Sequence, residues 1–124
     1  MRIATTIARI FLGLAFVVFG VFPFLTFLPQ PPPPPGLAGD YVKVFTASHY
    51  AQVIGAMQFL SGLMLLTGKF VPLGLTILAA ILFNIWAFHL LMAPATIFPG
   101  AVATLLWAFV FWGYRERFTE ILRP

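Results

Sequence analysis

Cysteine is absent from this chain of 124 residues, and charged residues make up only 8% of it. Without cysteine, the chain can form no disulfide, thiolate metal site, iron–sulfur cluster or CxxC redox pair of its own. Soluble domains carry about 25% charged residues, so the shortage of charge argues against an ordinary water-facing surface. Hydrophobic residues make up 61% of the sequence instead. A domain of this size buries only part of its surface, so lipid is the expected solvent.

Four apolar runs are each able to cross a membrane core about 30 Å thick, which takes about 20 helical residues. They span about 6–28, 49–67, 71–92 and 99–114. The outer loop 29–48 includes five consecutive prolines, which favour an extended polyproline II conformation. Its part from Leu37 to Ser48 is predicted to form a short amphipathic helix on the membrane surface, with a solvated loop as the alternative. The expected fold is all-α, a single membrane domain 1–124 forming an integral membrane four-helix bundle.

Basic residues indicate the orientation of this bundle. With four crossings, both termini and the 68–71 turn share one side, which holds Arg2, Arg9, Lys69, Arg115, Arg117 and Arg123. The other side has only Lys43, offset by Asp40. Positively charged flanks stay on the cytoplasmic side, so we expect a multi-pass protein with cytoplasmic N- and C-termini. Because the basic residues flank apolar runs and form no patch, nucleic acid is not an expected partner.

Small residues recur along each run at helical spacing. Lipid does not drive helices together hydrophobically, so close contact depends on small side chains and interhelical hydrogen bonds. The expected helix-packing positions are Gly13, Gly20, Gly55, Gly62, Ala80, Gly100, Thr104 and Ala108. We expect these stripes to face the inside of the bundle and the Phe and Leu side chains to face lipid.

A few polar side chains fall inside the apolar runs, where they are costly and often functional. Gln52, Gln58 and Asn84 are the amides at this depth. One interpretation is that they form interhelical hydrogen bonds that fix the packing. The other is that Gln52, Gln58 and Asn84, together with His89, form a polar pocket for a small amphiphile such as a quinone head group.

His49 and His89 both fall near the expected outer interface, where the fold could bring them together. A closed zinc site uses four ligands, so two histidines alone predict no metal site. Each could cap a helix or meet lipid head groups, or one could be the axial ligand of a haem or pigment. No catalytic constellation can be assembled from the remaining residues, so we expect no cofactor within the chain and no enzyme activity of its own.

Several segments resemble the DoxX family of small membrane proteins. They are ArgIlePheLeuGlyLeu at 9–14, PheValValPheGly at 16–20, GlyLeuMetLeuLeuThrGlyLysPheValProLeuGly at 62–74 and AsnIleTrpAlaPheHisLeu at 84–90. The resemblance implies four membrane helices in a bacterial-type inner membrane and an association with quinone-linked electron-transfer complexes. Many members have a Glu where this chain has Gln58 and a Lys near Val21, whereas Asn84 and His89 match the family pattern.

These observations favour a non-catalytic accessory or structural subunit of a larger membrane redox or energy-transducing complex. Its partners would be membrane lipids and other membrane subunits or further copies of itself. The first alternative is a quinone-binding component of a membrane oxidoreductase. The second is a small-molecule transporter, although the chain has no evident inverted repeat.

Overall fold

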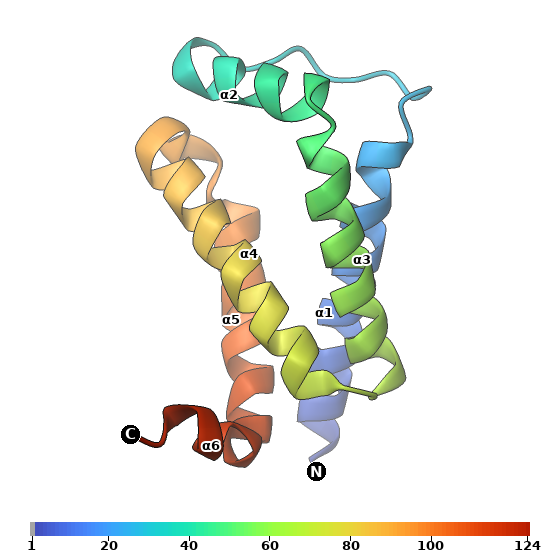
Figure 1. Cartoon of the computed structure of the whole chain (residues 1–124), viewed down its shortest axis with the longest axis vertical. Coiled ribbons are helices and arrows are strands. Elements are labelled where there is room, and N and C mark those ends of the chain that lie inside the picture. The colour runs from blue at the N-terminus through green and yellow to red at the C-terminus, as the bar shows by residue number, and fades with distance from the viewer. Residues whose placement is uncertain (1) are drawn as a thin grey trace.

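The computed structural model describes residues 2–124, and every regular element in that range is helical. Four long helices pass back and forth: α1 (Ile3–Val21), α3 (Tyr50–Thr67), α4 (Val71–Met92) and α5 (Phe98–Tyr114). Helix α2 (Gly36–Ala47) lies across one end of these four, and both termini lie at the other end (Figure 1). Short helical turns complete the chain: η1 (Phe22–Phe24), η2 (Pro94–Thr96), η3 (Arg115–Phe118) and α6 (Thr119–Leu122).

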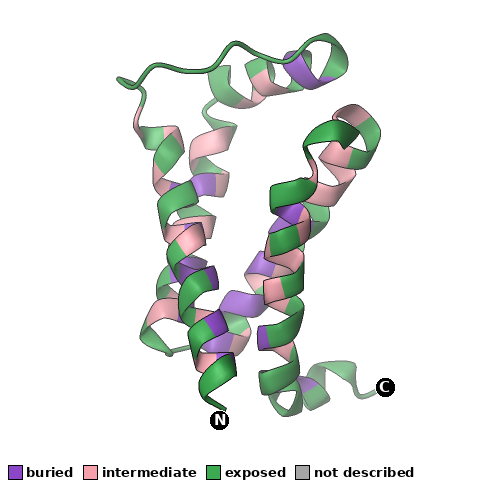
Figure 2. Ribbon diagram, turned by 180° about the vertical axis from the view of Figure 1, so that it is seen from behind, coloured by how far each residue is buried: buried purple, intermediate pink, exposed green. Residues whose placement is uncertain are grey.

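Three of these helical segments are long and apolar enough to cross a membrane. They are Ile3–Phe24, Tyr50–Thr67 and Val71–Met92. The sequence indicated a fourth crossing at 99–114, where α5 has 17 residues. At 1.5 Å per residue α5 is about 26 Å long, slightly shorter than a typical bilayer core. Large apolar side chains are exposed on all four long helices, and Figure 2 shows exposed residues along each of them.

The first helical segment is shorter than the sequence indicated. It ends with the turn η1 at Phe24, and Leu25 leaves the helical region at φ −92° and ψ 58°. Proline explains the early end, because Pro23 lacks the N–H that a continuing helix would need and its ring crowds the preceding turn. The other breaks follow the sequence more closely. Gly68, at φ +74°, ends α3, and Pro72 lies in the first turn of α4.

Helices α1 and α3 pack through two matched pairs of glycines. A Cβ atom added to Gly62 would lie 2.7 Å from the Gly13 carbonyl oxygen, and one added to Gly20 would lie 2.5 Å from the Gly55 carbonyl oxygen. Both spacings are shorter than van der Waals contact, so the two backbones touch where the side chains are missing. The predicted small-residue stripes of the first two runs therefore face each other directly.

The small residues predicted to face inward on α5 are Gly100, Thr104 and Ala108, and only the first two do so. Gly100 is buried against Ile85, and the Thr104 hydroxyl accepts a 2.8 Å hydrogen bond from the Trp86 indole. Ala108 differs from the expectation, because it is exposed. The close approach at this level is made instead by Trp107, whose indole donates to the Leu75 carbonyl oxygen at 2.9 Å.

The hydrophobic core is concentrated at the end of the molecule where the termini lie. Its fully enclosed members are Leu12 from α1, Leu65 from α3, Leu75 and Leu78 from α4, and Val110 from α5. Gly74 brings α4 close to α3 here, since a Cβ at that position would be 2.7 Å from a Leu65 methyl group. We refer to this half of the molecule as the closed end and to the half beneath α2 as the open end.

Candidate functional site

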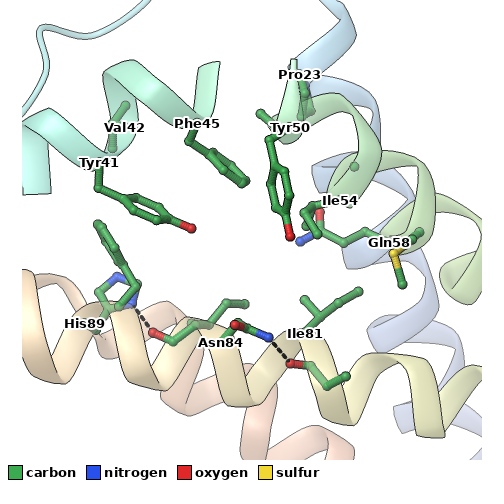
Figure 3. A pocket seen from close by; sticks show the side chains of 16 residues that line it. Pro23, Tyr41, Val42, Phe45, Tyr50, Ile54, Gln58, Ile81, Asn84 and His89 are labelled. Carbon is green, nitrogen blue, oxygen red and sulfur yellow. Dashed lines mark hydrogen bonds between the residues drawn. The ribbon is translucent and has the colours of Figure 1, made fainter. Parts of the chain in front are cut away.

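A cavity of about 370 Å³ occupies the open end, between α3 and α4 and beneath α2. Helix α2 contributes Tyr41, Val42 and Phe45 to its walls, and Pro23 of η1 closes one corner (Figure 3). Its long walls are the facing surfaces of α3, between Tyr50 and Gln58, and of α4, between Ala80 and His89. The volume falls at the low end of the range of about 300–1,000 Å³ typical of small-molecule sites.

Two polar side chains of α4 line this cavity with part of their hydrogen-bonding capacity already used. The Asn84 amide nitrogen donates to the Ala80 carbonyl oxygen at 2.9 Å, which leaves its Oδ1 atom free as an acceptor. The Nδ1 atom of His89 lies 2.8 Å from the Ile85 carbonyl oxygen. A carbonyl can only accept, so Nδ1 carries the proton, and the Nε2 atom of the neutral ring is an acceptor. Local bonds therefore orient both groups in advance.

Three more polar groups line the cavity without a protein partner. Within residues 2–124, the Gln58 amide and the hydroxyls of Tyr41 and Tyr50 make no hydrogen bond to other side chains or to the backbone. Figure 3 shows both hydroxyls pointing into the space between α2, α3 and α4. Gln58 is half-buried, so its unpartnered amide marks a place where a ligand or water is expected, and the two tyrosine hydroxyls, whose residues are exposed, converge on the same space.

Aromatic rings form the cover of the cavity. The Tyr41 ring of α2 lies 5.1 Å from the Phe88 ring of α4, and the Phe45 ring of α2 lies 5.5 Å from the Tyr50 ring of α3. Tyr41 and Phe45 also stack on each other at 5.4 Å. These distances are typical of favourable aromatic contacts. Helix α2 is thus held over the open end by its rings, and its Gly39 packs against the carbonyl oxygen of Pro34 in the proline segment.

The cavity lining is mostly aliphatic and aromatic, and its polar side chains are amides, phenols and one imidazole. Its described lining contains no Asp, Glu, Lys or Arg, and the groups other than the five polar ones are aliphatic, aromatic or thioether. Such a site suits a neutral, flat molecule with hydrogen-bonding atoms at its edge, because a charged ligand would have no counter-ion there.

The structure brings Gln58, Asn84 and His89 together, but it separates Gln52 from them. Gln52 lines a second hollow of about 470 Å³ with His49, between η1 and the junction of α2 and α3. Its amide nitrogen donates weakly to the Pro23 carbonyl oxygen at 3.5 Å. The reason is the helical repeat: six residues at 100° each put Gln52 and Gln58 about 120° apart around α3.

The two histidines line different hollows, His49 the second one and His89 the cavity beneath α2. His49 has a left-handed backbone, at φ +64°, where the chain turns from α2 into α3. In the described range, no group of three or more His, Asp or Glu residues lies close enough to hold a metal ion.

Sequence reasoning missed the aromatic part of the site. Tyr50, Ile54, Met57 and Gln58 follow the i, i+4, i+7, i+8 spacing of one helix face, so the wall of α3 could have been recognised from periodicity. Tyr41 and Phe45 could not, because nothing in the sequence specifies how the proline segment directs α2 over the bundle.

Comparison with known proteins gives no match: no family model, curated protein or solved structure is similar to this chain. The resemblance to the DoxX family therefore rests on the short sequence segments alone.

Proposed function

We propose that this chain is a multi-pass membrane protein in which α1, α3, α4 and α5 all cross the bilayer. The exposed apolar side chains on each of these helices support it, among them Phe11, Val53, Phe83 and Leu105. Six of the seven basic residues belong to the closed end, namely Arg2, Arg9, Lys69, Arg115, Arg117 and Arg123. The excess of positive charge there supports a cytoplasmic closed end, with α2 at the outer face of a bacterial-type inner membrane.

Within this membrane protein, we propose that the cavity beneath α2 binds the ring of a quinone. The observation that carries the proposal is the convergence of unpartnered polar atoms in a cavity that is otherwise aromatic and aliphatic. A quinone ring is flat and neutral, and it presents carbonyl oxygens at opposite edges. Amide and hydroxyl donors on both sides of the cavity match that pattern.

The residues that would hold the ring come from three helices. Gln58 and the hydroxyls of Tyr41 and Tyr50 can donate to its carbonyl oxygens. Asn84 Oδ1 and His89 Nε2 are acceptors, so they suit a hydroxyl of the reduced ring. The bound quinone would supply the redox chemistry, and the chain would bind and orient the ring away from water.

A direct test measures binding of decyl-benzoquinone to the full chain in lipid nanodiscs by isothermal titration calorimetry. Replacing Gln58→Leu and Tyr50→Phe together removes two of the proposed donors to the quinone carbonyl oxygens, each worth about 1 kcal/mol. The dissociation constant should rise about thirtyfold. Thr76→Val is the matched control, because the Thr76 hydroxyl bonds to Pro72 within α4 and does not line the cavity. An unchanged affinity in the double variant, with helicity intact, would show that the cavity is not the quinone site.

An accessory role in a larger electron-transfer complex remains compatible with this proposal. In that case the chain would present the quinone to a neighbouring subunit that carries the redox centres. The transporter alternative remains a prediction, and a proteoliposome flux measurement distinguishes it from quinone binding.

A further inference from the structure

We infer that the ligand of this cavity carries a long apolar tail and that it enters sideways from the lipid, through a mouth between α3 and α4. The inference rests on the proposed function and adds the ligand class and the route. It is based on three observations: the position of the opening between α3 and α4, the depth of that opening along the helices, and the placement of α2 over the other end of the cavity.

The opening lies between two helices and not at the end of the bundle. Met57 of α3 lines the cavity and is 39% exposed. Across from it, Ala80 and Asn84 of α4 also line the cavity and are exposed. Exposed lining residues from both helices define a mouth, whose rim is a thioether, a methyl group and an amide.

The mouth lies at the depth of the hydrocarbon core if α3 and α4 cross the bilayer. Met57 is seven residues from the start of α3, and Asn84 is eight residues from the end of α4. At 1.5 Å per residue, these positions are about 10 and 12 Å below the helix ends that face α2. A bilayer core is about 30 Å thick, so the rim meets acyl chains and not water.

Helix α2 lies over the end of the cavity that faces water, where the lining residues Tyr41 and Tyr50 are 40% and 56% exposed. Tyr41, Val42 and Phe45 extend from α2 into the cavity wall, and the first and third of these contact rings on α4 and α3. A ligand arriving from water would have to displace these contacts, whereas a ligand in the lipid meets an opening. A polar ring with an apolar tail would therefore leave the tail between the acyl chains.

Asn84 gives the mouth its selectivity. An amide exposed at membrane depth is costly unless it is partnered, and its Oδ1 atom has no partner among the described residues. A hydroxyl of the reduced ring that donates to this atom would remove that cost on entering. Hydrocarbon tails alone offer no such bond, so ordinary acyl chains would compete poorly for the cavity.

The test compares decyl-benzoquinone with the same ring lacking its tail, in nanodiscs, with both concentrations expressed per lipid in the membrane. It also compares Met57→Trp, which narrows the mouth, with Leu60→Trp, which adds the same bulk on an exposed part of α3 outside the cavity. We expect the tailed ring to bind at least about tenfold more tightly than the tailless one. We expect Met57→Trp to weaken it about tenfold and Leu60→Trp to leave it unchanged.

Each other outcome has a definite meaning. If the tailless ring binds as tightly as the tailed one, or if Met57→Trp has no effect, the lateral route is wrong and the quinone site itself stands. If neither ring binds, the proposed function fails. A second measurement uses the unaltered chain: a diazirine at the end of the tail should label residues beside Met57 and Ala80. Labelling confined to α2 would overturn the lateral route.

Discussion

Helices α3 and α4 meet closely at one end of the molecule and separate at the other. At the closed end, Gly74 lies against Ser61 and Leu65, and the surrounding side chains are fully buried. At the open end, the same two helices carry Gln58 and Asn84, and a cavity of about 370 Å³ lies between them. Helices α3 and α4 thus pack closely at the closed end, and their Gln58 and Asn84 side chains lie at the open end, where the two helices are separated. The difference predicts that added volume is harmful at one set of positions and tolerated at the other.

The largest effect should come from Gly62→Val, because its side chain would press on the backbone of Gly13 and Val17 in α1. Backbone atoms cannot move aside as side chains do, so we expect a destabilisation of about 3 kcal/mol. Thermal unfolding in detergent followed by circular dichroism measures it. Leu60→Val, an exposed change on α3, is the control and should behave as the unaltered chain does. Equal stability of the two variants would mean that α1 and α3 are not in glycine-mediated contact.

An intermediate effect is expected at the two indole hydrogen bonds. Trp107→Phe removes the interhelical bond to Leu75, and because Trp107 also packs against the buried core, the smaller ring loses contacts there and the total loss should be about 1 kcal/mol. Trp86→Phe removes the bond to Thr104, and interhelical bonds of this kind average about 0.6 kcal/mol. Unfolding of both variants in the same detergent gives the ranking. A larger loss of unfolding free energy for Trp86→Phe than for Trp107→Phe would contradict the claim that the closed end is the more tightly packed one.

The smallest effect on stability should come from Ala80→Phe, which places a ring in the open cavity. Space is present there, so the free energy of unfolding should change by no more than about 0.5 kcal/mol. Quinone binding should nevertheless be lost, because the ring fills the site. A destabilisation comparable to that of Gly62→Val would indicate that the cavity is closed in solution.

Much of the helical framework could be predicted from the sequence. The third run was expected at 71–92, and α4 spans Val71–Met92, because a turn with Gly68 and a proline at position 72 marks its start. A short helix was expected within Leu37–Ser48, where α2 spans Gly36–Ala47. The first run was extended too far, to Leu28, because hydrophobicity continues past Pro23 although the helical hydrogen bonding does not.

The candidate site could be predicted only in part. The sequence predicts one polar pocket from the positions of Gln58, Asn84 and His89 within the apolar segments, and these three residues do line one cavity. Gln52 was expected to line the same pocket, but it lies about 120° from Gln58 around α3 and lines the second hollow. Tyr41 and Phe45 depend on the path of the prolines between α1 and α2, which is a long-range property of the fold.

The most direct test of the account is hydrogen–deuterium exchange of the full chain in nanodiscs, with and without saturating decyl-benzoquinone. A ring bound beneath α2 stabilises the contacts of Tyr41 and Phe45, so exchange should slow across 36–47 and remain unchanged across 115–122 at the closed end. Identical exchange of α2 with and without the quinone would contradict the claim that this cavity is its binding site.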